Sequence, residues 1–158
     1  MRIIILGCGR VGSTLAAILT REGNHVTVID RDQAAFDKAA QRLGPSFTQH
    51  TVCGIGIDQV VLRQAGIEEA DAFICVTSGD NTNIVAAQMA QKHFNVPKVL
   101  ARVYDPIRAD AYREAGVETI CATTVTAGLF HDLVLGRPLR SIQEYIDTAS
   151  PGREASGD

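Results

Sequence analysis

A glycine-rich turn near the N-terminus holds the residues best suited to chemistry in this chain. Gly7, Gly9 and Gly12 follow the apolar run Ile3–Leu6, and a helical pattern begins at once. A strand, G-x-G-x-x-G and a helix in this order are typical of a dinucleotide-binding turn, in which the first N–H groups of the helix hold a phosphate. Gly7 would permit the tight turn, Gly9 the approach of a pyrophosphate, and Gly12 close packing of the helix on the strand. All residues of the turn are expected to border the ligand: Gly7, Cys8, Gly9, Arg10, Val11 and Gly12.

A carboxylate stands where the second strand of such a unit ends. Val26–Ile29 is a second apolar run, and Asp30 follows it, eighteen positions after Gly12. There a carboxylate can accept hydrogen bonds from two ribose hydroxyls, each contributing roughly 1.5–3 kcal/mol. The same charge repels a 2′-phosphate, which disfavours NADP, although Arg31 beside it weakens that exclusion. The sequence therefore predicts a site for an adenine nucleotide, either NAD(H) or ATP/ADP.

The loop after the third expected strand contains Gly54, Ile55 and Gly56. Ligands of a doubly wound sheet bind outside the carboxyl ends of the strands, so the adenine is expected beside this loop. The two glycines would let the backbone approach the base while Ile55 covers its face, and an ordinary glycine loop is the alternative. Arg10 would place a positive charge beside the phosphates, or would face solvent at the helix start.

Polar residues also follow the fourth expected strand and end the fifth. Thr77, Ser78 and Asn83 could bind a phosphate or ribose, although such residues also cap helices. Arg102 lies in an apolar parallel strand, where an unpaired charge is costly, so a phosphate or Asp80 is expected beside it. The chain shows no nucleophile elbow, no general acid–base pair in a pocket loop and no metal-ligand spacing. We therefore predict binding without catalysis.

Helix and strand patterns alternate as far as Gly136, which predicts an α/β fold with one Rossmann-type, doubly wound parallel sheet of six strands in the order 3-2-1-4-5-6. The expected strands are Arg2–Leu6, His25–Asp30, Ser46–Val52, Ala72–Thr77, Lys98–Val103 and Glu118–Cys121. The expected helices are Arg10–Glu22, Gln33–Leu43, Asp58–Ala65, Asn81–Phe94, one from Asp105-Pro106, and one through Leu135 capped by Thr123 or Thr124. Residues 1–136 form the predicted nucleotide-binding domain. Residues 137–158 are predicted to be a linker and disordered tail, with Leu139–Ile146 a short strand or linker and Ser150–Asp158 disordered.

Composition narrows the class of protein. A chain of 158 residues, 46% hydrophobic and 21% charged, suits one domain with a sizeable core. A net charge of −3 offers no electrostatic footprint for nucleic acid or anionic lipid. No apolar run approaches the roughly 20 residues that span a bilayer, and no signal peptide precedes the first strand. We expect a cytoplasmic protein that reaches a membrane only through a partner.

The first helix and the cysteines supply further predicted core residues. The apolar face of the first helix comprises Val11, Leu15, Ile18 and Leu19. Cys53, Cys75 and Cys121 lie in or beside strands, where a free cysteine is typical of core packing. Cys8 lies near a helix N-terminus that could lower its pKa, which leaves a redox role open beside that of a small residue filling the turn.

Taken together, these motifs resemble the RCK family, also called KTN or TrkA-N, over residues 1–136. The segments that carry the resemblance are Gly7–Gly12, Val28–Asp30, Val61–Gly66, Ile67–Ala72, Val76–Asn81 and Ala101–Pro106. Members of that family are cytoplasmic nucleotide-binding subunits that regulate bacterial potassium channels and transporters. The resemblance implies that the glycine turn and Asp30 hold adenosine and phosphates, and that Arg10 and Arg102 neutralise the phosphates. Many members have an acidic residue where this chain has Ile55.

The resemblance also implies assembly. Family members pair through their last helix and form rings beneath the pore, so a homo-oligomer is expected, as a dimer or an octameric ring. An apolar stripe on the last expected helix suits that contact, although packing on its own sheet is the alternative. The stripe consists of Leu129, Phe130, Leu133 and Val134.

Three functions follow from these observations. The first is a regulatory subunit of a potassium uptake system, which binds an adenine nucleotide and gates an integral membrane channel or transporter at the inner membrane. The alternative is a nicotinamide-dependent oxidoreductase or its cofactor-binding half. The third is a free-standing nucleotide or redox sensor with Cys8 as its switch.

Overall fold

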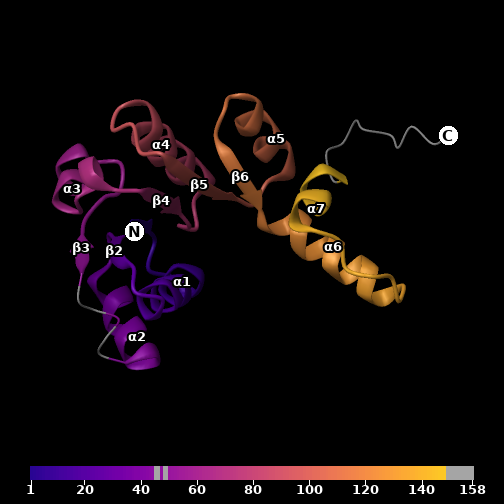
Figure 1. The fold of residues 1–158 in the computed structure, drawn as a ribbon, viewed down its shortest axis with the longest axis horizontal. Helices are drawn as coiled ribbons and strands as arrows, with labels where there is room; N and C mark the ends of the chain where they lie inside the picture. The colour runs from indigo at the N-terminus through magenta and orange to yellow at the C-terminus, as the bar shows by residue number, and fades with distance from the viewer. Residues whose placement is uncertain (45–46, 48–49, 149–158) are drawn as a thin grey trace. The chain divides into compact units, whose positions relative to one another are not determined.

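The protein is described by a computed structural model that covers residues 1–44, 47 and 50–148. It contains a six-stranded sheet in the order β3-β2-β1-β4-β5-β6, as predicted, with helices between the strands (Figure 1). The strands are β1 Arg2–Leu6, β2 His25–Asp30, β3 Thr51–Cys53, β4 Ala72–Cys75, β5 Lys98–Val103 and β6 Glu118–Cys121. The helices are α1 Arg10–Arg21, α2 Gln33–Leu43, α3 Gln59–Gln64, the 3₁₀ turn η2 Ile67–Glu69, α4 Asp80–Lys92, α5 Pro106–Glu114, α6 Ala122–Val134 and α7 Ile142–Thr148.

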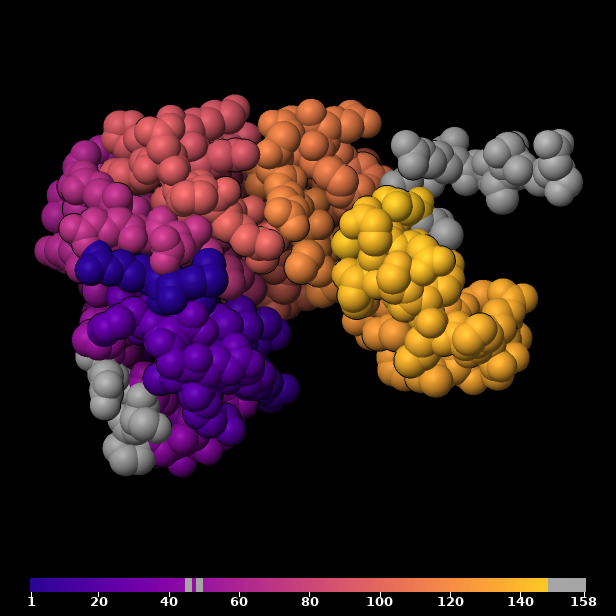
Figure 2. Space-filling model, in the orientation of Figure 1, coloured from indigo at the N-terminus to yellow at the C-terminus, as the bar shows by residue number. Residues whose placement is uncertain are grey.

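The chain divides into two units, residues 1–101 and the residues from 102 onward. In the first unit β1 is the central strand and pairs in parallel with β2 and β4, so that Ile5 stands opposite Val28 and Ile74. Central parallel strands are covered on both faces, and β1 is accordingly buried from Ile3 to Leu6. Helices α1 and α2 lie on one side of these strands and α3 and α4 on the other. Figure 2 shows α2 in purple below the indigo N-terminal residues, and α3 and α4 in magenta to rose above them.

Helix α1 packs on the sheet through small residues and not through its large apolar ones. Gly12, Ser13, Ala16 and Ala17 are its buried residues, which brings the helix axis close to the strands. The predicted apolar face is only partly correct, because Leu15 and Leu19 pack against the core while Val11 and Ile18 are exposed. Hydrophobic periodicity favours large apolar residues on the buried face, whereas close helix–strand contact favours the smallest residues.

Several predicted boundaries move in the structure. The third strand is Thr51–Cys53 instead of Ser46–Val52, and residues 46, 48 and 49 lie outside the described part. Strand β4 ends at Cys75, two residues before the predicted end at Thr77. Helix α6 begins after Cys121 without a side-chain cap, so the predicted threonine cap is wrong. The hydroxyl of Thr124 is instead buried and donates to the Cys121 sulfur at 3.2 Å.

The second unit contains a helix that the sequence reading missed. Residues 142–148 form α7, where a short strand or linker was predicted. Its start is a capping box, in which Ser141 N donates to Glu144 Oε2 at 2.7 Å and Glu144 N donates to Ser141 Oγ at 3.3 Å. Tyr145 is 1% exposed and lies so close to α6 that a Cβ added at Gly128 would stand 2.5 Å from its ring. The predicted tail Ser150–Asp158 lies outside the described residues.

An ion pair closes the hairpin of α6 and α7. Arg140 Nε donates to Asp132 Oδ2 at 2.8 Å, and the carboxylate of Asp132 is 3% exposed. The guanidinium of Arg140 also lies 4.6 Å from the centre of the Tyr145 ring. The hydrogen bond from Arg140 is the largest influence that lowers the pKa of Asp132, from 3.8 to about 2. No helix in the described part of the chain is both long and apolar enough to span a bilayer.

Candidate functional site

The glycine turn lies between the end of β1 and the start of α1. Gly7 has φ +108°, and a Cβ added there would lie 2.9 Å from Thr77 N. A Cβ at Gly12 would collide with the carbonyl oxygen of Gly7, which is the close helix–strand approach expected from the sequence. A Cβ at Gly9 would meet nothing within 4 Å. The fold itself therefore demands glycine at 7 and 12, whereas at 9 the backbone borders open space.

The first turn of α1 leaves donors available to a ligand. Its N-cap is Gly9, which has no side chain, so no side-chain cap satisfies the first N–H groups of the helix. Ser13 donates its hydroxyl back to the Gly9 carbonyl at 2.7 Å and fixes this turn from below. The N–H groups of the helix start and their partial positive charge suit a phosphate oxygen.

Asp30 ties the end of β2 to this turn. Its Oδ2 accepts a hydrogen bond from Cys8 N at 2.7 Å, and its Oδ1 accepts one from Asp32 N at 3.0 Å. Gly7 N also donates to Ile29 O at 2.7 Å. A carboxylate oxygen offers about two acceptor sites, so each oxygen of the half-buried Asp30 keeps capacity for a ribose hydroxyl. Arg31 next to it is exposed.

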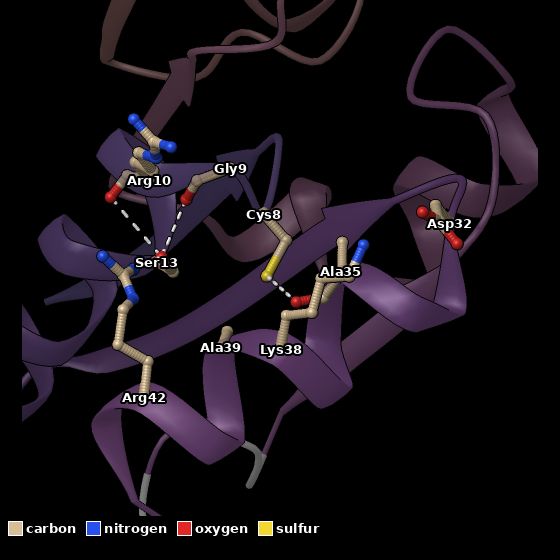
Figure 3. A pocket seen from close by; sticks show the side chains of 9 residues that line it. All are labelled: Cys8, Gly9, Arg10, Ser13, Asp32, Ala35, Lys38, Ala39 and Arg42. Carbon is tan, nitrogen blue, oxygen red and sulfur yellow. Dashed lines mark hydrogen bonds between the residues drawn. The ribbon is translucent and has the colours of Figure 1, made fainter.

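A cavity of about 340 Å³ opens between the start of α1 and the face of α2 (Figure 3). Its lining residues are Cys8, Gly9, Arg10, Ser13, Asp32, Ala35, Lys38, Ala39 and Arg42. The sequence motifs predict the turn residues at this site but not the side chains of α2. The missed signal was the spacing of Ala35, Lys38, Ala39 and Arg42, which places two cations and two small residues on one helix face.

The cysteines behave differently from two of the predictions. Cys8 is buried, and burial, followed by the charge of Asp30, raises the pKa of its thiol to about 11. The alternative in which the helix start lowers this pKa is therefore not supported, and a buried Cys8 agrees with a small residue that fills the turn. Cys53 is exposed at the edge strand, so its predicted core position is also wrong. Cys75 and Cys121 are buried as predicted, and burial raises the pKa of Cys75.

The loop after β3 owes its glycines to packing within the protein. A Cβ at Gly54 would lie 2.6 Å from a methyl of Val61, and one at Gly56 would collide with Leu6. These contacts favour the ordinary glycine loop, the alternative considered for this segment, over a backbone opened for adenine. The side chain of Ile55, however, is 60% exposed and remains available to cover a base.

The turn after β4 is held by a buried amide. Asn83 is fully buried, its Oδ1 accepts from Thr77 N at 2.9 Å, and its Nδ2 donates to Thr77 O at 2.9 Å. The Thr77 hydroxyl also donates to Asn83 Oδ1, at 2.7 Å. Asn83 therefore positions this turn against Gly7, and its contact with a ligand stays a prediction. Ser78 is exposed on the same turn.

Arg102, at the end of β5, belongs to the second unit. It is half-buried, and its guanidinium lies 4.6 Å from the centre of the Tyr104 ring. This stacking helps to explain how an arginine is tolerated in an apolar strand. Its contact with a phosphate stays a prediction.

The matching family model and two similar relatives all carry the name TrkA. The model of the TrkA-N domain matches residues 3–123. The Trk system potassium uptake protein TrkA of Streptomyces coelicolor is 53% identical over 146 residues, which cover 92% of this chain and 62% of that protein. A TrkA homolog of Methanothermobacter thermautotrophicus is 31% identical over 138 residues, 87% of this chain and 62% of that protein. The chain thus spans less than two thirds of each relative.

Solved structures share the fold. The TrkA-N domain of the inner membrane protein ybaL from Escherichia coli has a TM-score of 0.72 at 19% identity, covers 84% of this chain and is itself covered to 96%. The structure of GsuK bound to ADP has a TM-score of 0.68 at 28% identity, over 84% of this chain and 33% of that one. The GsuK RCK domain gives 0.69 at 28% identity, over 85% of this chain and 28% of that one.

Proposed function

The chain belongs to the TrkA-N domain family, and from this premise we propose that it is a regulatory subunit of a potassium uptake system that binds an adenine nucleotide. One observation carries the proposal: Asp30 is tied to the glycine turn, whose backbone is open at Gly9 and whose helix start has no side-chain cap. This arrangement suits a ribose beside a phosphate. The names of the TrkA relatives and the ADP-bound GsuK structure support it.

The proposed ligand is NAD(H) or ATP/ADP. The Asp30 carboxylate would accept from the ribose hydroxyls, the first N–H groups of α1 would bind phosphate oxygens, and Ile55 would cover the adenine. Arg10 would add charge beside the phosphates. When bound, the nucleotide supplies only its shape and charge to this mechanism, because we propose regulation and no turnover. The potassium uptake names of the relatives favour this role over the oxidoreductase alternative.

Regulation requires that the ligand distinguish two shapes of an assembly. A nucleotide shifts such an equilibrium only by its differential affinity for the two shapes. We propose that the assembly is a homo-oligomer, at least a dimer, that acts from the cytoplasm on an integral membrane channel or transporter. Its contact surface would be α6, where Phe130, Leu133 and Val134 are 69%, 61% and 85% exposed. Their exposure favours a second copy over packing on the chain's own sheet.

Titration calorimetry with ATP, ADP, NAD⁺ and NADH tests the nucleotide site. We expect at least one of the four to bind with one site per chain, and Asp30→Ala to weaken that binding. Failure of all four to bind the folded protein would overturn the proposal. Co-purification with a membrane-embedded potassium transporter subunit tests the partner separately.

A further inference from the structure

The cavity between α1 and α2 has more positive charge than a single phosphate at the glycine turn requires. Three cationic side chains line it: Arg10 from α1, and Lys38 and Arg42 from α2 (Figure 3). Asp32 is the carboxylate of the lining, and its Oδ1 already accepts from Ala34 N at 3.0 Å. Cations that share a cavity repel one another, so an anion between them would stabilise the arrangement. This concentration of charge is notable in a chain whose net charge is −3.

The shape of the α2 face leaves room for that anion. Ala35, Lys38, Ala39 and Arg42 follow one another at helical spacing and line the cavity, and Figure 3 shows the guanidinium of Arg42 directed toward Ser13. The small side chains of Ala35 and Ala39 leave space between the long side chains of Lys38 and Arg42. The volume of about 340 Å³ lies at the lower end of the roughly 300–1,000 Å³ typical of ligand pockets.

The cations are also coupled to the nucleotide turn. Arg42 donates from its Nη2 to the hydroxyl of Ser13, and that hydroxyl donates to the Gly9 carbonyl. A guanidinium held in this way can bind phosphate oxygens through two parallel N–H groups, and Lys38 adds a point charge. Within the described residues, none of the three cations forms an ion pair with a carboxylate.

We propose that this cavity binds the terminal phosphates of a phosphate chain, and that Lys38 and Arg42 make the site prefer a nucleoside triphosphate over a monophosphate. The inference rests on the proposed nucleotide site, because the first phosphate is placed by the glycine turn. The terminal phosphates would extend from Gly9 along the α2 face. The chemistry recognised is a chain of linked phosphates, which ATP or a free oligophosphate could supply.

Calorimetric titrations of the full chain with AMP, ATP and tripolyphosphate test this inference. The variants are Lys38→Gln and Arg42→Gln, and the matched control is Lys92→Gln, which removes an exposed cation from the last turn of α4. We expect ATP to bind the unmodified protein more tightly than AMP. Each α2 variant should weaken ATP binding about threefold to tenfold more than AMP binding, while the control should retain the full preference for ATP.

The outcomes separate this inference from the proposed function. If AMP and ATP bind the unmodified protein with equal affinity, or if the preference for ATP survives both α2 substitutions, the inference is overturned. The proposed nucleotide site is not affected by either result. Failure of both AMP and ATP to bind would refute the inference, and only the further failure of ADP, NAD⁺ and NADH would refute the proposed nucleotide site. Loss of tripolyphosphate binding in the α2 variants together with loss of ATP preference would assign the cavity to any phosphate chain. Loss of ATP preference alone would assign it to the nucleotide's own phosphates.

Discussion

The carboxylate of Asp30 accepts a hydrogen bond from the backbone N–H of Cys8, with 2.7 Å between oxygen and nitrogen. The bond joins the end of the second strand to the glycine turn after the first. Because Asp30 also accepts from Asp32 N, one carboxylate fixes the turn before it and the loop after it. The residue proposed to bind the ribose is thus also the residue that shapes the phosphate site.

Asp30→Asn should therefore weaken both nucleotide binding and the local structure. An amide has one acceptor oxygen in place of two, so either Cys8 N or Asp32 N would face an N–H group. We expect about tenfold weaker binding of the preferred nucleotide and a loss of about 1 kcal/mol in the free energy of unfolding. Calorimetry and urea unfolding measure the two effects. Asp37→Asn, on the exposed face of α2, is the matched control and should change neither.

The glycines of the turn should separate folding from binding. Gly9→Ala places a methyl group in open space, so the melting temperature should stay within about a degree or rise slightly. The same methyl group would stand where the phosphate is proposed, and nucleotide affinity should fall at least about tenfold. Gly12→Ala drives a methyl group into the Gly7 carbonyl and should greatly destabilise the fold. Calorimetry and thermal unfolding of both variants check this, and unchanged nucleotide affinity in Gly9→Ala would contradict the proposed site.

The turn and the sheet order could be predicted because their signals are local. Gly7, Gly12 and Asp30 have fixed spacings within one strand–helix–strand unit, and the structure gives them positions that explain these residue types. The α7 helix also has a local signal, the capping pair Ser141 and Glu144, although the hydrophobic periodicity of that segment is irregular. In this segment the capping box is a better predictor of a helix than the irregular hydrophobic pattern.

The rest depended on packing between elements distant in sequence. The spacing of Lys38 and Arg42 places them on one face of α2, but the sequence does not indicate that this face borders the glycine turn, because that follows from how α2 packs beside α1. The pKa of Cys8 likewise reflects burial and the nearby charge of Asp30, which together outweigh the lowering by the charge of Arg42. The glycines at 54 and 56 suggested a ligand, and the side chains of Val61 and Leu6 account for them instead.

Thiol chemistry should distinguish Cys8 from Cys53. Cys8 is buried with a pKa of about 11, so little thiolate forms near neutral pH, whereas Cys53 is exposed. We expect iodoacetamide near neutral pH to modify Cys53 first and to leave Cys8 unmodified in the folded protein. Peptide mass spectrometry reads out each site, and denaturation should make all four cysteines reactive. Rapid labelling of Cys8 would restore the redox-switch hypothesis.

The exposed face of α6 should control the oligomeric state. Phe130→Asp or Val134→Asp places a carboxylate on the proposed contact surface, where its burial against a second copy would be costly. We expect these variants to shift sedimentation from a dimer or larger assembly toward the monomer. Ile107→Asp is the matched control, since Ile107 is 71% exposed on α5. A monomeric unmodified protein, or equal assembly of all three variants, would exclude α6 as the contact.

The ion pair between Asp132 and Arg140 should make the α6–α7 hairpin sensitive to acid. The pKa of Asp132 lies near 2 in the folded protein, below its ordinary 3.8, so the ionised form is favoured by folding. The stability that Asp132 contributes is therefore complete above about pH 5 and is lost as the pH falls through its folded pKa. The difference in unfolding free energy between the unmodified protein and Asp132→Asn should shrink over that range. Arg140→Gln removes the main cause of the lowered pKa. When Asp132→Asn is made in the Arg140→Gln protein, the resulting change in unfolding free energy should therefore depend much less on pH. A difference that is the same in acid and at neutral pH would show that the pair adds nothing to the stability of the hairpin.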